Sequence, residues 1–376
     1  MGGGIGLELE GRVPFSRRVR AQAMQSARRL VVKLGTGVLT DARNRPDLVQ
    51  LAQLVSQMAA LRASGREVVL VTSGAVGAGM GVLGFDSRPA SLAERQACAA
   101  VGQSRLMAMY EELFRHFAQP VAQVLLTHED LADHARHLNA RNTLLTLLRH
   151  GVLPIINEND AVSVTELKFG DNDRLSALVA SLLPADLLVV LTTAEGLIED
   201  FGRPTARLVD VVERIDERIE SMAGGTTSAT ATGGMATKIA AARIVVRSGI
   251  PMVIAPGRKH DVLARIVSGE AEGTLFLPSG GRLPSRKRWI AFYHHARGGV
   301  RVDAGAAEAL KARGRSLLAA GVTGCDGDFR AGDVVRVLGP DGREFARGIA
   351  RCDAAGLGDG KAGRGEVVHR DDLVIL

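Results

Sequence analysis

Carboxylate and amide side chains gather in one short stretch of the chain, residues 151–183. The stretch opens with an apolar, β-branched run at residues 152–156, which is typical of a buried parallel strand. It closes with apolar residues at the spacing of one helix face. Open α/β sheets bind ligands at connectors of this kind, at the carboxyl ends of their strands. The polar residues between the two elements are Asn157, Glu158, Asn159, Asp160, Glu166, Lys168, Asp171, Asn172 and Asp173.

The same stretch also has a purely structural interpretation. Asn and Asp make turns and cap helices, and residues 171–173 directly precede the apolar helix face. Taken alone, the stretch supports a ligand site and a capping cluster about equally, so the other polar motifs must decide between them.

Two lysines stand where they could reach a phosphate. Lys33 precedes a Gly-Thr-Gly turn at the end of a strand, and Lys238 is the fourth residue of a helix entered through Thr232, Gly233 and Gly234. A glycine-rich loop that runs into a helix N-terminus presents free N–H groups and a positive dipole, which favour an anion. Neither motif is a Walker A loop, and no GxGxxG follows the first strand.

Strands and helices alternate along most of the chain. Strands are expected at residues 30–34, 68–71, 121–126, 152–156, 187–191 and 250–254, and helices at residues 48–61, 91–117, 136–149, 235–247 and 261–267. This order predicts an α/β fold with a largely parallel central sheet and helices on both faces.

In a parallel sheet, the turns that follow Lys33, Val71, Ile156 and Leu191 converge at one edge. That edge then holds two cations, backbone donors, acids and amides. It suits a phosphoryl donor on one side and a small polar acceptor on the other, because in phosphoryl transfer the protein mainly positions groups and neutralises charge.

Length and composition set the outer limits. A chain of 376 residues that is 46% hydrophobic has room for two or three domains with a sizeable core. The longest apolar candidate for a membrane helix, residues 175–191, is broken by Pro184 and Asp186. Three cysteines form neither a CxxC nor a zinc pattern, which favours a reducing cytoplasm. Residues 1–26 are rich in Gly and Arg without an apolar signal segment, and we expect a poorly ordered extension there.

The last part of the chain has a different character. Residues 278–376 carry 17 Lys and Arg against 12 Asp and Glu, whereas the rest carries 30 against 29. Short strands and tight turns replace the strand–helix alternation there. We expect a catalytic domain at residues 27–277, a linker at 278–290 and a small β-rich domain at 291–376, whose basic balance would suit an anionic partner.

At this point the motifs resemble a known family. VVKLGTGVL, VTSGAVGAG, INENDAV, GDNDRLSALVA and TGGMATK look like the successive signatures of the glutamate 5-kinases, within the amino-acid kinase family. The resemblance starts near Leu30 and includes RKRWI and the closing VHRDDL. The tail resembles a PUA domain. The resemblance implies a three-layer αβα sandwich with a mainly parallel sheet, followed by a small β-barrel-like domain.

The resemblance also assigns roles to single residues. Lys33 and Lys238 would hold the transferring phosphoryl group, with Asp173 positioning both ammonium groups. Ser73, Asp160, Asn172 and Asn157 would bind the amino-acid substrate. The residues that would hold the nucleotide are Lys33, Gly35, Thr192, Thr193, Thr232, Gly233, Gly234, Met235, Ala236, Thr237 and Lys238; no protein ligand to a metal is assigned.

The implied activity is ATP- and Mg²⁺-dependent phosphorylation of the side-chain carboxylate of L-glutamate, giving L-glutamyl 5-phosphate and ADP, the first step of proline biosynthesis. The implied partners are proline as a feedback inhibitor, a glutamyl-phosphate reductase as the next enzyme, and RNA at the PUA domain. A homo-oligomer, dimer or tetramer, and no membrane association are expected.

The chain departs from the family pattern at two positions near the expected nucleotide. Thr193 stands where the family usually has Asp, and Gly37 where Ser is common. Both departures bring nucleotide contacts into question. The scattered His128, His134, His137 and His150 lack metal spacing and are expected at the surface or the core edge, and Arg105 is expected to be structural.

Two other interpretations are compatible with the sequence. A related kinase with another carboxylate or carbamate acceptor would keep both lysines but change the neighbourhood of Asp160. An RNA-binding or regulatory protein with a vestigial kinase domain would fit the basic tail and Thr193, although the intact lysines and Asp173 disfavour decay.

Overall fold

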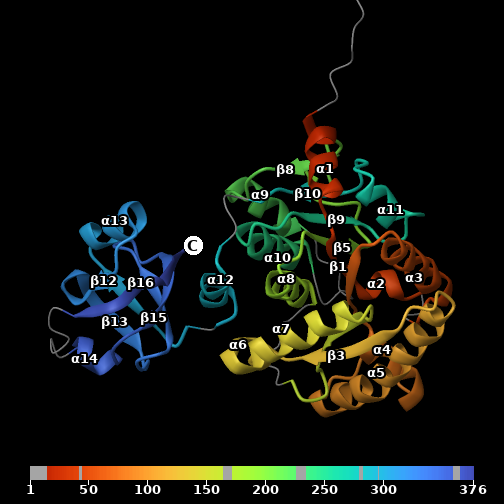
Figure 1. Ribbon diagram of the computed structural model, residues 1–376, viewed down its shortest axis with the longest axis horizontal. Helices are drawn as coiled ribbons and strands as arrows, with labels where there is room; N and C mark the ends of the chain where they lie inside the picture. Colours follow the sequence, from red (N-terminus) through yellow and green to blue (C-terminus); the bar gives the residue numbers. More distant parts are fainter. Residues whose placement is uncertain are drawn as a thin grey trace, which may run out of the picture.

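The computed structural model of the chain describes residues 15–41, 45–163, 172–225, 234–278, 283–294, 296–358 and 365–376. Within these ranges the chain forms a large α/β unit and a smaller β-rich unit (Figure 1). No helix in the described ranges combines the length and apolar character that crossing a bilayer requires.

The larger unit is organised around an eight-stranded sheet of order β3-β4-β2-β1-β5-β9-β10-β8. Every described pairing in it is parallel except β10 with β9. Its strands are β1 (Arg29–Leu34), β2 (Glu67–Val71), β3 (Val121–Leu126), β4 (Leu153–Glu158), β5 (Leu187–Thr192), β8 (Val211–Val212), β9 (Met252–Pro256) and β10 (Thr274–Phe276). The small hairpin β6 (Ile198–Glu199) and β7 (Arg207–Leu208) lies apart from the sheet's hydrogen-bonding.

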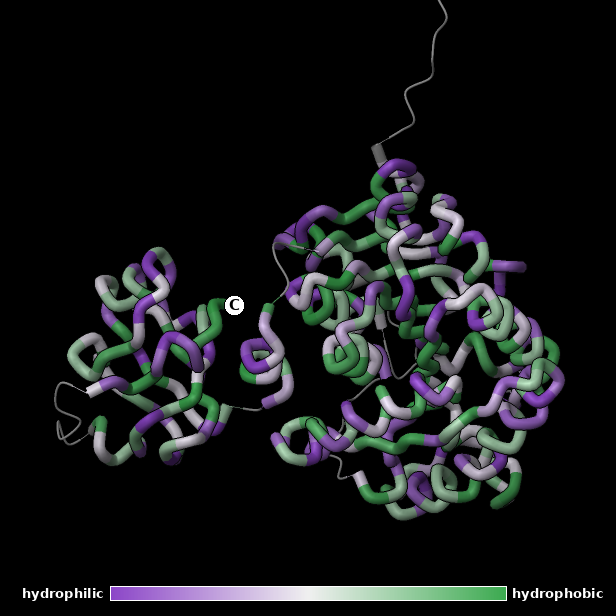
Figure 2. Tube along the Cα trace, in the orientation of Figure 1, coloured by the Kyte–Doolittle hydropathy of each residue, from purple (hydrophilic) through white to green (hydrophobic). Residues whose placement is uncertain are grey.

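Helices cover both faces of this sheet, which makes the predicted three layers. Figure 2 shows hydrophobic residues along the central strands between the helices. One apolar core lies under α6 (His128–Ala132), α7 (His134–Arg149), α8 (Asn172–Leu182), α9 (Glu217–Ser221) and α10 (Met235–Arg247). The other lies under α1 (Phe15–Gln25), α2 (Thr36–Leu39), α3 (Leu48–Ala63), α5 (Leu92–Arg115) and α11 (Val262–Val267), and α4 (Ala75–Leu83) packs against α5.

The alternation of β1 decides which way Lys33 points. Leu30, Val32 and Leu34 belong to the core under α3 and α5, whereas Val31 belongs to the core under α8 and α10. Because side chains alternate between the faces of a strand, Lys33 lies on the α8 and α10 face with Val31. The site described below is the consequence.

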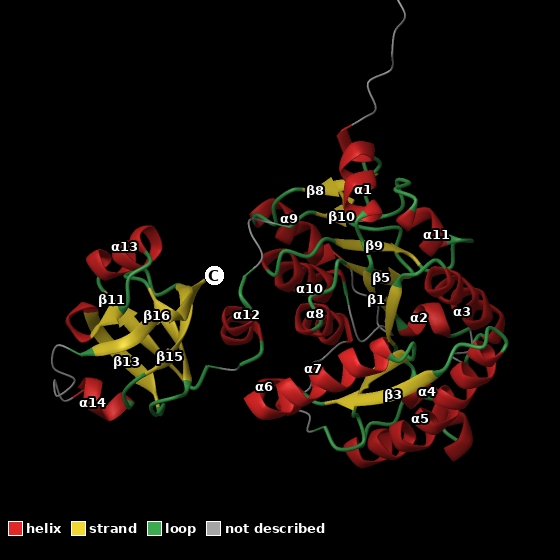
Figure 3. Cartoon of the chain, in the orientation of Figure 1, coloured by secondary structure: helices red, strands yellow, loops and turns green. Residues whose placement is uncertain are grey.

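The smaller unit is a curled six-stranded sheet of order β12-β16-β15-β14-β11-β13, as Figure 3 shows. This half-barrel agrees with the small barrel-like domain expected from the sequence. Its elements are β11 (Gly298–Val302), α13 (Ala304–Arg313), β12 (Leu317–Leu318), β13 (Val322–Gly327), β14 (Val334–Leu338), β15 (Glu344–Ala350), α14 (Ala354–Gly358) and β16 (Glu366–Ile375).

Two expectations about the ends of the catalytic unit differ from the structure. Residues 1–26 were expected to be poorly ordered, but residues 15–25 form α1, and residues 1–14 lie outside the described ranges. Arg20 is buried and donates to Asp210 Oδ1 and to the carbonyl oxygens of Glu272 and Gly273, which fixes α1 to the sheet edge.

The expected linker at 278–290 ends in a helix, α12 (Ser285–Phe292), which Figure 1 shows between the two units. Its apolar residues join the core under α8, and the Tyr293 hydroxyl that follows donates to the Leu178 carbonyl at 2.6 Å. On its other side Arg347 of β15 donates to the carbonyl oxygens of Ala291 and His294. The second half of the linker is therefore a packed structural element.

Of the four histidines expected at the surface or the core edge, His134 and His150 are exposed, whereas His128 and His137 are buried. The His137 ring packs edge-on against Tyr293 with centroids 4.7 Å apart, and His134 does the same against Trp289 at 5.0 Å. Burial lowers the pKa of His137 to about 4. These rings join α7 to α12.

Candidate active site

A buried carboxylate joins the two lysines. Asp173, in the first turn of α8, is fully buried and accepts hydrogen bonds from Lys33 Nζ at 2.5 Å and Lys238 Nζ at 3.0 Å. The Thr237 hydroxyl also donates to Asp173 Oδ2, at 2.9 Å. The expectation that Asp173 stands between both ammonium groups is met by these contacts.

Three separate elements supply this arrangement. Lys33 comes from the central strand β1, Asp173 from α8 and Lys238 from α10, and the two helices pack side by side on the same face of the sheet. A carboxylate in the first turn of a helix is favoured by the positive end of the helix dipole. The N-terminus of α8 and the two lysines therefore both favour a negative charge at Asp173.

The three charged side chains can act as one anion-binding unit. Two ammonium groups close together in a protein interior would repel each other, and the carboxylate between them removes that cost. Together the three carry a net charge of +1. A phosphoryl group that approaches the unit therefore meets two positioned N–H₃⁺ donors with an excess positive charge. A single lysine–carboxylate pair would have no such excess.

Next to this unit lies a cluster of amides and hydroxyls. The Asn172 side-chain amide donates to the Thr72 carbonyl at 2.7 Å and reaches both Ser73 Oγ and Asn157 Oδ1 at 2.9 Å. Ser73 and Asn157 are buried at the ends of β2 and β4. Asn172 thus contacts two of the other three residues predicted to bind the amino-acid substrate, Ser73 and Asn157.

The fourth, Asp160, lies two residues beyond the end of β4 in a half-buried turn at the same strand edge. The loop that follows it, residues 164–171, lies outside the described ranges and includes Glu166, Lys168 and Asp171.

Sequence reasoning missed a member of this cluster. Gln103 of α5 is buried, and its Oε1 accepts from Asn157 Nδ2 at 2.8 Å. The signal was present in the VGQSRL stretch, of which only Arg105 was considered; Arg105 is exposed. A polar residue on the buried side of an otherwise apolar helix face would have been the clue.

Two of the expected nucleotide residues, Thr192 and Thr193, line a cavity at the end of β5. The cavity has a volume of about 380 Å³ and is lined by Thr192, Thr193, Glu195, Pro256, Arg258 and Lys259. Glu195, two residues beyond Thr193, supplies a carboxylate to a site that lacks the family's usual Asp. The cations Arg258 and Lys259 were not predicted.

Arg258, which lines this cavity, also connects it to α3. Its guanidinium pairs with Asp47 at 3.0 Å, the residue that caps α3. A hydrogen bond from the Gln50 N–H and the Arg258 guanidinium together hold the pKa of Asp47 below its usual value.

The two departures from the family pattern meet in space. A Cβ added to Gly37 would lie 2.9 Å from Thr193 Cγ2, closer than real Cβ contacts allow. The absence of a side chain at 37 therefore makes room for the branched side chain at 193. Gly35 lies beside them, with its N–H donating to the Leu191 carbonyl.

The N-terminus of α10 forms the other side of the predicted nucleotide site. Gly234 caps the helix in an extended conformation, and within the described residues no side chain caps its first N–H groups, which is an arrangement that favours an anion. Met235 is buried and Ala236 is exposed, whereas Thr232 and Gly233 lie outside the described ranges.

The described side chains do not make a metal cage. Across the described part of the chain, no three His, Cys, Asp or Glu residues group together as ligands for a metal ion.

The chain is similar to known proteins over most of its length. The amino acid kinase family model matches residues 28–256, and the PUA domain model matches residues 298–371. A glutamate 5-kinase of Moorella thermoacetica is 48% identical over 369 residues, covering 94% of this chain and 98% of that protein. A glutamate 5-kinase of Deinococcus radiodurans is 49% identical over 363 residues, covering 93% and 100%. Among solved structures, a carbamate kinase from Giardia lamblia bound to AMP-PNP covers 68% of this chain and 100% of its own, at 19% identity and a TM-score of 0.48.

Proposed function

This chain belongs to the glutamate 5-kinases of the amino-acid kinase family, and from that premise we propose how its residues carry out the reaction. The enzyme transfers the terminal phosphoryl group of ATP to the side-chain carboxylate of L-glutamate. The products are L-glutamyl 5-phosphate and ADP, and the step opens proline biosynthesis.

The acceptor needs no general base. A glutamate side chain has a pKa of about 4.3, so at neutral pH it is already an ionised nucleophile. The obstacle is the repulsion between this anion and the anionic phosphate. The site must therefore supply positive charge and alignment rather than remove a proton.

The buried unit of Lys33, Asp173 and Lys238 meets this requirement, and it is the observation that carries the proposal. Lys33 and Lys238 would hold the non-bridging oxygens of the transferring group, with Asp173 keeping the two ammonium groups 2.5 and 3.0 Å from its own oxygens. Their positions are set before substrate binds, so little reorganisation is required in the transition state.

The two substrates would lie on either side of this unit. Ser73, Asn157 and Asn172 would bind glutamate, with Asp160 as the partner of its α-amino group. Gly35, Thr192, Thr193 and residues 232–238 would hold ATP. When bound, Mg²⁺ would supply neutralisation of phosphate charge, and the phosphates of the nucleotide would hold it.

A coupled assay of ADP release tests the assignment. The enzyme is given ATP and Mg²⁺ with L-glutamate, L-aspartate, N-acetylglutamate or buffer alone, and glutamate is expected to be the only strong acceptor. Turnover of aspartate or acetylglutamate but not glutamate would favour a related kinase. Absence of turnover with all three would sink the proposal.

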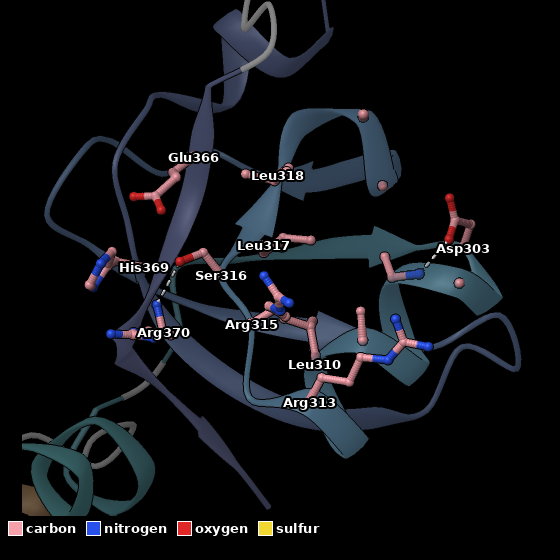
Figure 4. A pocket seen from close by; sticks show the side chains of 15 residues that line it. Asp303, Leu310, Arg313, Arg315, Ser316, Leu317, Leu318, Glu366, His369 and Arg370 are labelled. Atoms are coloured by element: carbon pink, nitrogen blue, oxygen red, sulfur yellow. Dashed lines mark hydrogen bonds between the residues drawn. The ribbon is translucent and has the colours of Figure 1, made fainter.

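A second proposal concerns the PUA domain, which carries a cavity of about 780 Å³ (Figure 4). Arg313 at the end of α13 and Arg315 just beyond it line the cavity together with His369 and Arg370 of β16 and the acidic Asp303 and Glu366. Among the described residues neither Arg313 nor Arg315 forms an ion pair, so both guanidinium groups are available to phosphates. We infer that this face binds RNA through contacts to the phosphates of the RNA backbone.

Salt-dependent RNA binding tests this second proposal. Fluorescence anisotropy with a structured RNA should show affinity that falls with salt, and Arg315→Glu should reduce the salt slope by roughly 1 or more. Arg343→Glu, an exposed arginine outside the cavity, is the matched control. Equal effects of both substitutions, or no binding at low salt, would exclude an RNA site here.

The remaining partners stay predictions. Proline is expected to act as a feedback inhibitor, as the resemblance to the glutamate 5-kinases implies. The acyl phosphate product is reactive and is expected to pass to a reductase. A homo-oligomeric state and a cytoplasmic location are likewise expectations from the sequence.

A further inference from the structure

Three amide side chains form a hydrogen-bonded row beside the catalytic lysines. Asn157 Nδ2 donates to Gln103 Oε1 at 2.8 Å, and Asn157 Oδ1 accepts from Asn172 Nδ2 at 2.9 Å. The row runs from α5 across the end of β4 to the start of α8. It connects a helix outside the predicted site with the helix that carries Asp173.

Backbone groups fix the direction of this row. The Glu158 N–H, which can only donate, points at Asn157 Oδ1 at 3.0 Å, and the Thr72 carbonyl, which can only accept, takes a hydrogen bond from Asn172 Nδ2. Asn157 and Asn172 therefore cannot be turned around without placing like groups against each other. Gln103 must in turn present its oxygen to Asn157.

Each end of the row is left with an unused polar atom. Among the described residues, Gln103 Nε2 and Asn172 Oδ1 are buried and have no hydrogen-bond partner. One is a donor and the other an acceptor. Since buried polar atoms are nearly always paired in a working state of a protein, these two point to a ligand that accepts at one end and donates at the other.

The helix that carries Gln103 is held rigidly. A Cβ on Gly102 would lie 1.8 Å from the Ala75 carbonyl oxygen, so α4 and α5 pack backbone against backbone. One further contact fixes α5 at a second point, because the buried Tyr110 hydroxyl lies 2.7 Å from Thr72 Oγ1. Gln103 is thus placed with the precision that substrate recognition needs.

We propose that Gln103 is a specificity-determining residue that donates a hydrogen bond from Nε2 to the α-carboxylate of the amino-acid substrate, while Asn172 Oδ1 accepts from its α-ammonium group together with the Asp160 carboxylate. An α-amino acid carries this acceptor and this donor on one carbon atom. The inference rests on the proposed function and adds the feature by which the enzyme reads the amino-acid end of its acceptor.

The test replaces the hydrogen-bond donor that faces the substrate's α-carboxylate with a negative charge. Gln103→Glu replaces the free N–H₂ with a carboxylate that repels the substrate's α-carboxylate. The competing substrate is isoglutamine, in which the α-carboxylate is an amide and the side-chain nucleophile is intact. In the ADP-release assay, KM for glutamate should rise about 10- to 100-fold with a smaller change in kcat. The preference for glutamate over isoglutamine, in turnover or competitive inhibition, should narrow by about tenfold or more.

Two further variants separate recognition from folding. Gln103→Met removes the donor without adding charge and should raise KM for glutamate less than Gln103→Glu does. Ser104→Glu adds the same charge to the exposed side of α5 and should leave KM for glutamate unchanged.

An unchanged KM for glutamate in Gln103→Glu, or an unchanged preference over isoglutamine, would overturn the inference. The inference would also fail if Gln103→Glu raised KM for ATP as much as KM for glutamate and lowered Tm, because these changes would indicate a structural role alone. If the unaltered enzyme does not phosphorylate glutamate at all, the proposed function fails, which is a different result.

Discussion

Replacing Asp173 by asparagine is the most direct perturbation of the site. The substitution preserves shape and removes one negative charge from a fully buried position that contacts two ammonium groups. The net charge of the three side chains then rises from +1 to +2. Removing one partner of a buried ion pair typically costs about 3–5 kcal/mol, because the remaining charge is left without compensation.

The expected loss can be measured as a shift in Tm. For a domain of this size each kcal/mol lowers Tm by roughly 2–4 °C, so Asp173→Asn should lower it by roughly 6–20 °C. ADP release should fall at least about 100-fold, since the lysines lose the group that aligns them. Phosphate or nucleotide should raise the Tm of the variant more than that of the unaltered enzyme, because an anion replaces the missing charge.

A second substitution checks that charge is the cause. Asp173→Asn combined with Lys238→Met returns the net charge to +1, and the double variant should recover a measurable part of the lost stability although it stays inactive. If Asp173→Asn alone were as stable as the unaltered enzyme, or if the double variant were less stable still, the electrostatic account of the site would be refuted.

Three further predictions concern other parts of the molecule. Lys238→Ala should abolish turnover and leave glutamate binding largely intact by calorimetry; unchanged turnover would remove Lys238 from the mechanism. His137, whose pKa is about 4 in the fold and about 6.5 when unfolded, contributes stability that is fully present above about pH 6.5 and is lost as pH falls toward 4, at about 1.4 kcal/mol per pH unit. Denaturation midpoints from pH 7 to 5 should therefore fall less steeply in His137→Gln, and an identical slope would contradict the burial argument. Gly37→Ala should weaken ATP binding by about 1–3 kcal/mol through its clash with the Thr193 methyl group, and Thr193→Ser should relieve it; a titration in which the second change brings no recovery would show that the two positions are independent.

The convergence of Lys33 and Lys238 at one sheet edge could be predicted from local sequence patterns, whereas the role of Asp173 between them came from the resemblance to the glutamate 5-kinases. Lys33 follows the alternation of a strand, Lys238 follows a glycine loop into a helix, and parallel strands bring such ends together. The same reasoning placed Ser73, Asn157 and Asn172 at one edge, where the structure joins them by hydrogen bonds.

The contacts of Arg20 and Gln103 could not be predicted, because their hydrogen-bond partners lie far away in the sequence. Arg20 was assigned to a poorly ordered, Gly- and Arg-rich extension because its acceptors, Asp210, Glu272 and Gly273, lie about 190 or more residues away. Gln103 looked like any polar helix residue because Asn157 is 54 residues away.

Gly37 and Thr193 were considered one at a time. Only their contact shows that the two departures from the family pattern are compatible with each other. A comparison of single positions with a family motif does not contain this information.

The packing of α12 has a practical consequence for shortening the chain. A truncation at the apparent domain boundary near residue 277 would strip Ile290, Phe292 and Tyr293 from the apolar surface of the kinase fold and leave the Leu178 carbonyl without its hydroxyl donor. A cut after residue 294 would keep this cover in place. An isolated catalytic fragment should therefore carry α12 with it, and the gap between two family matches is a poor guide to where a protein can be divided.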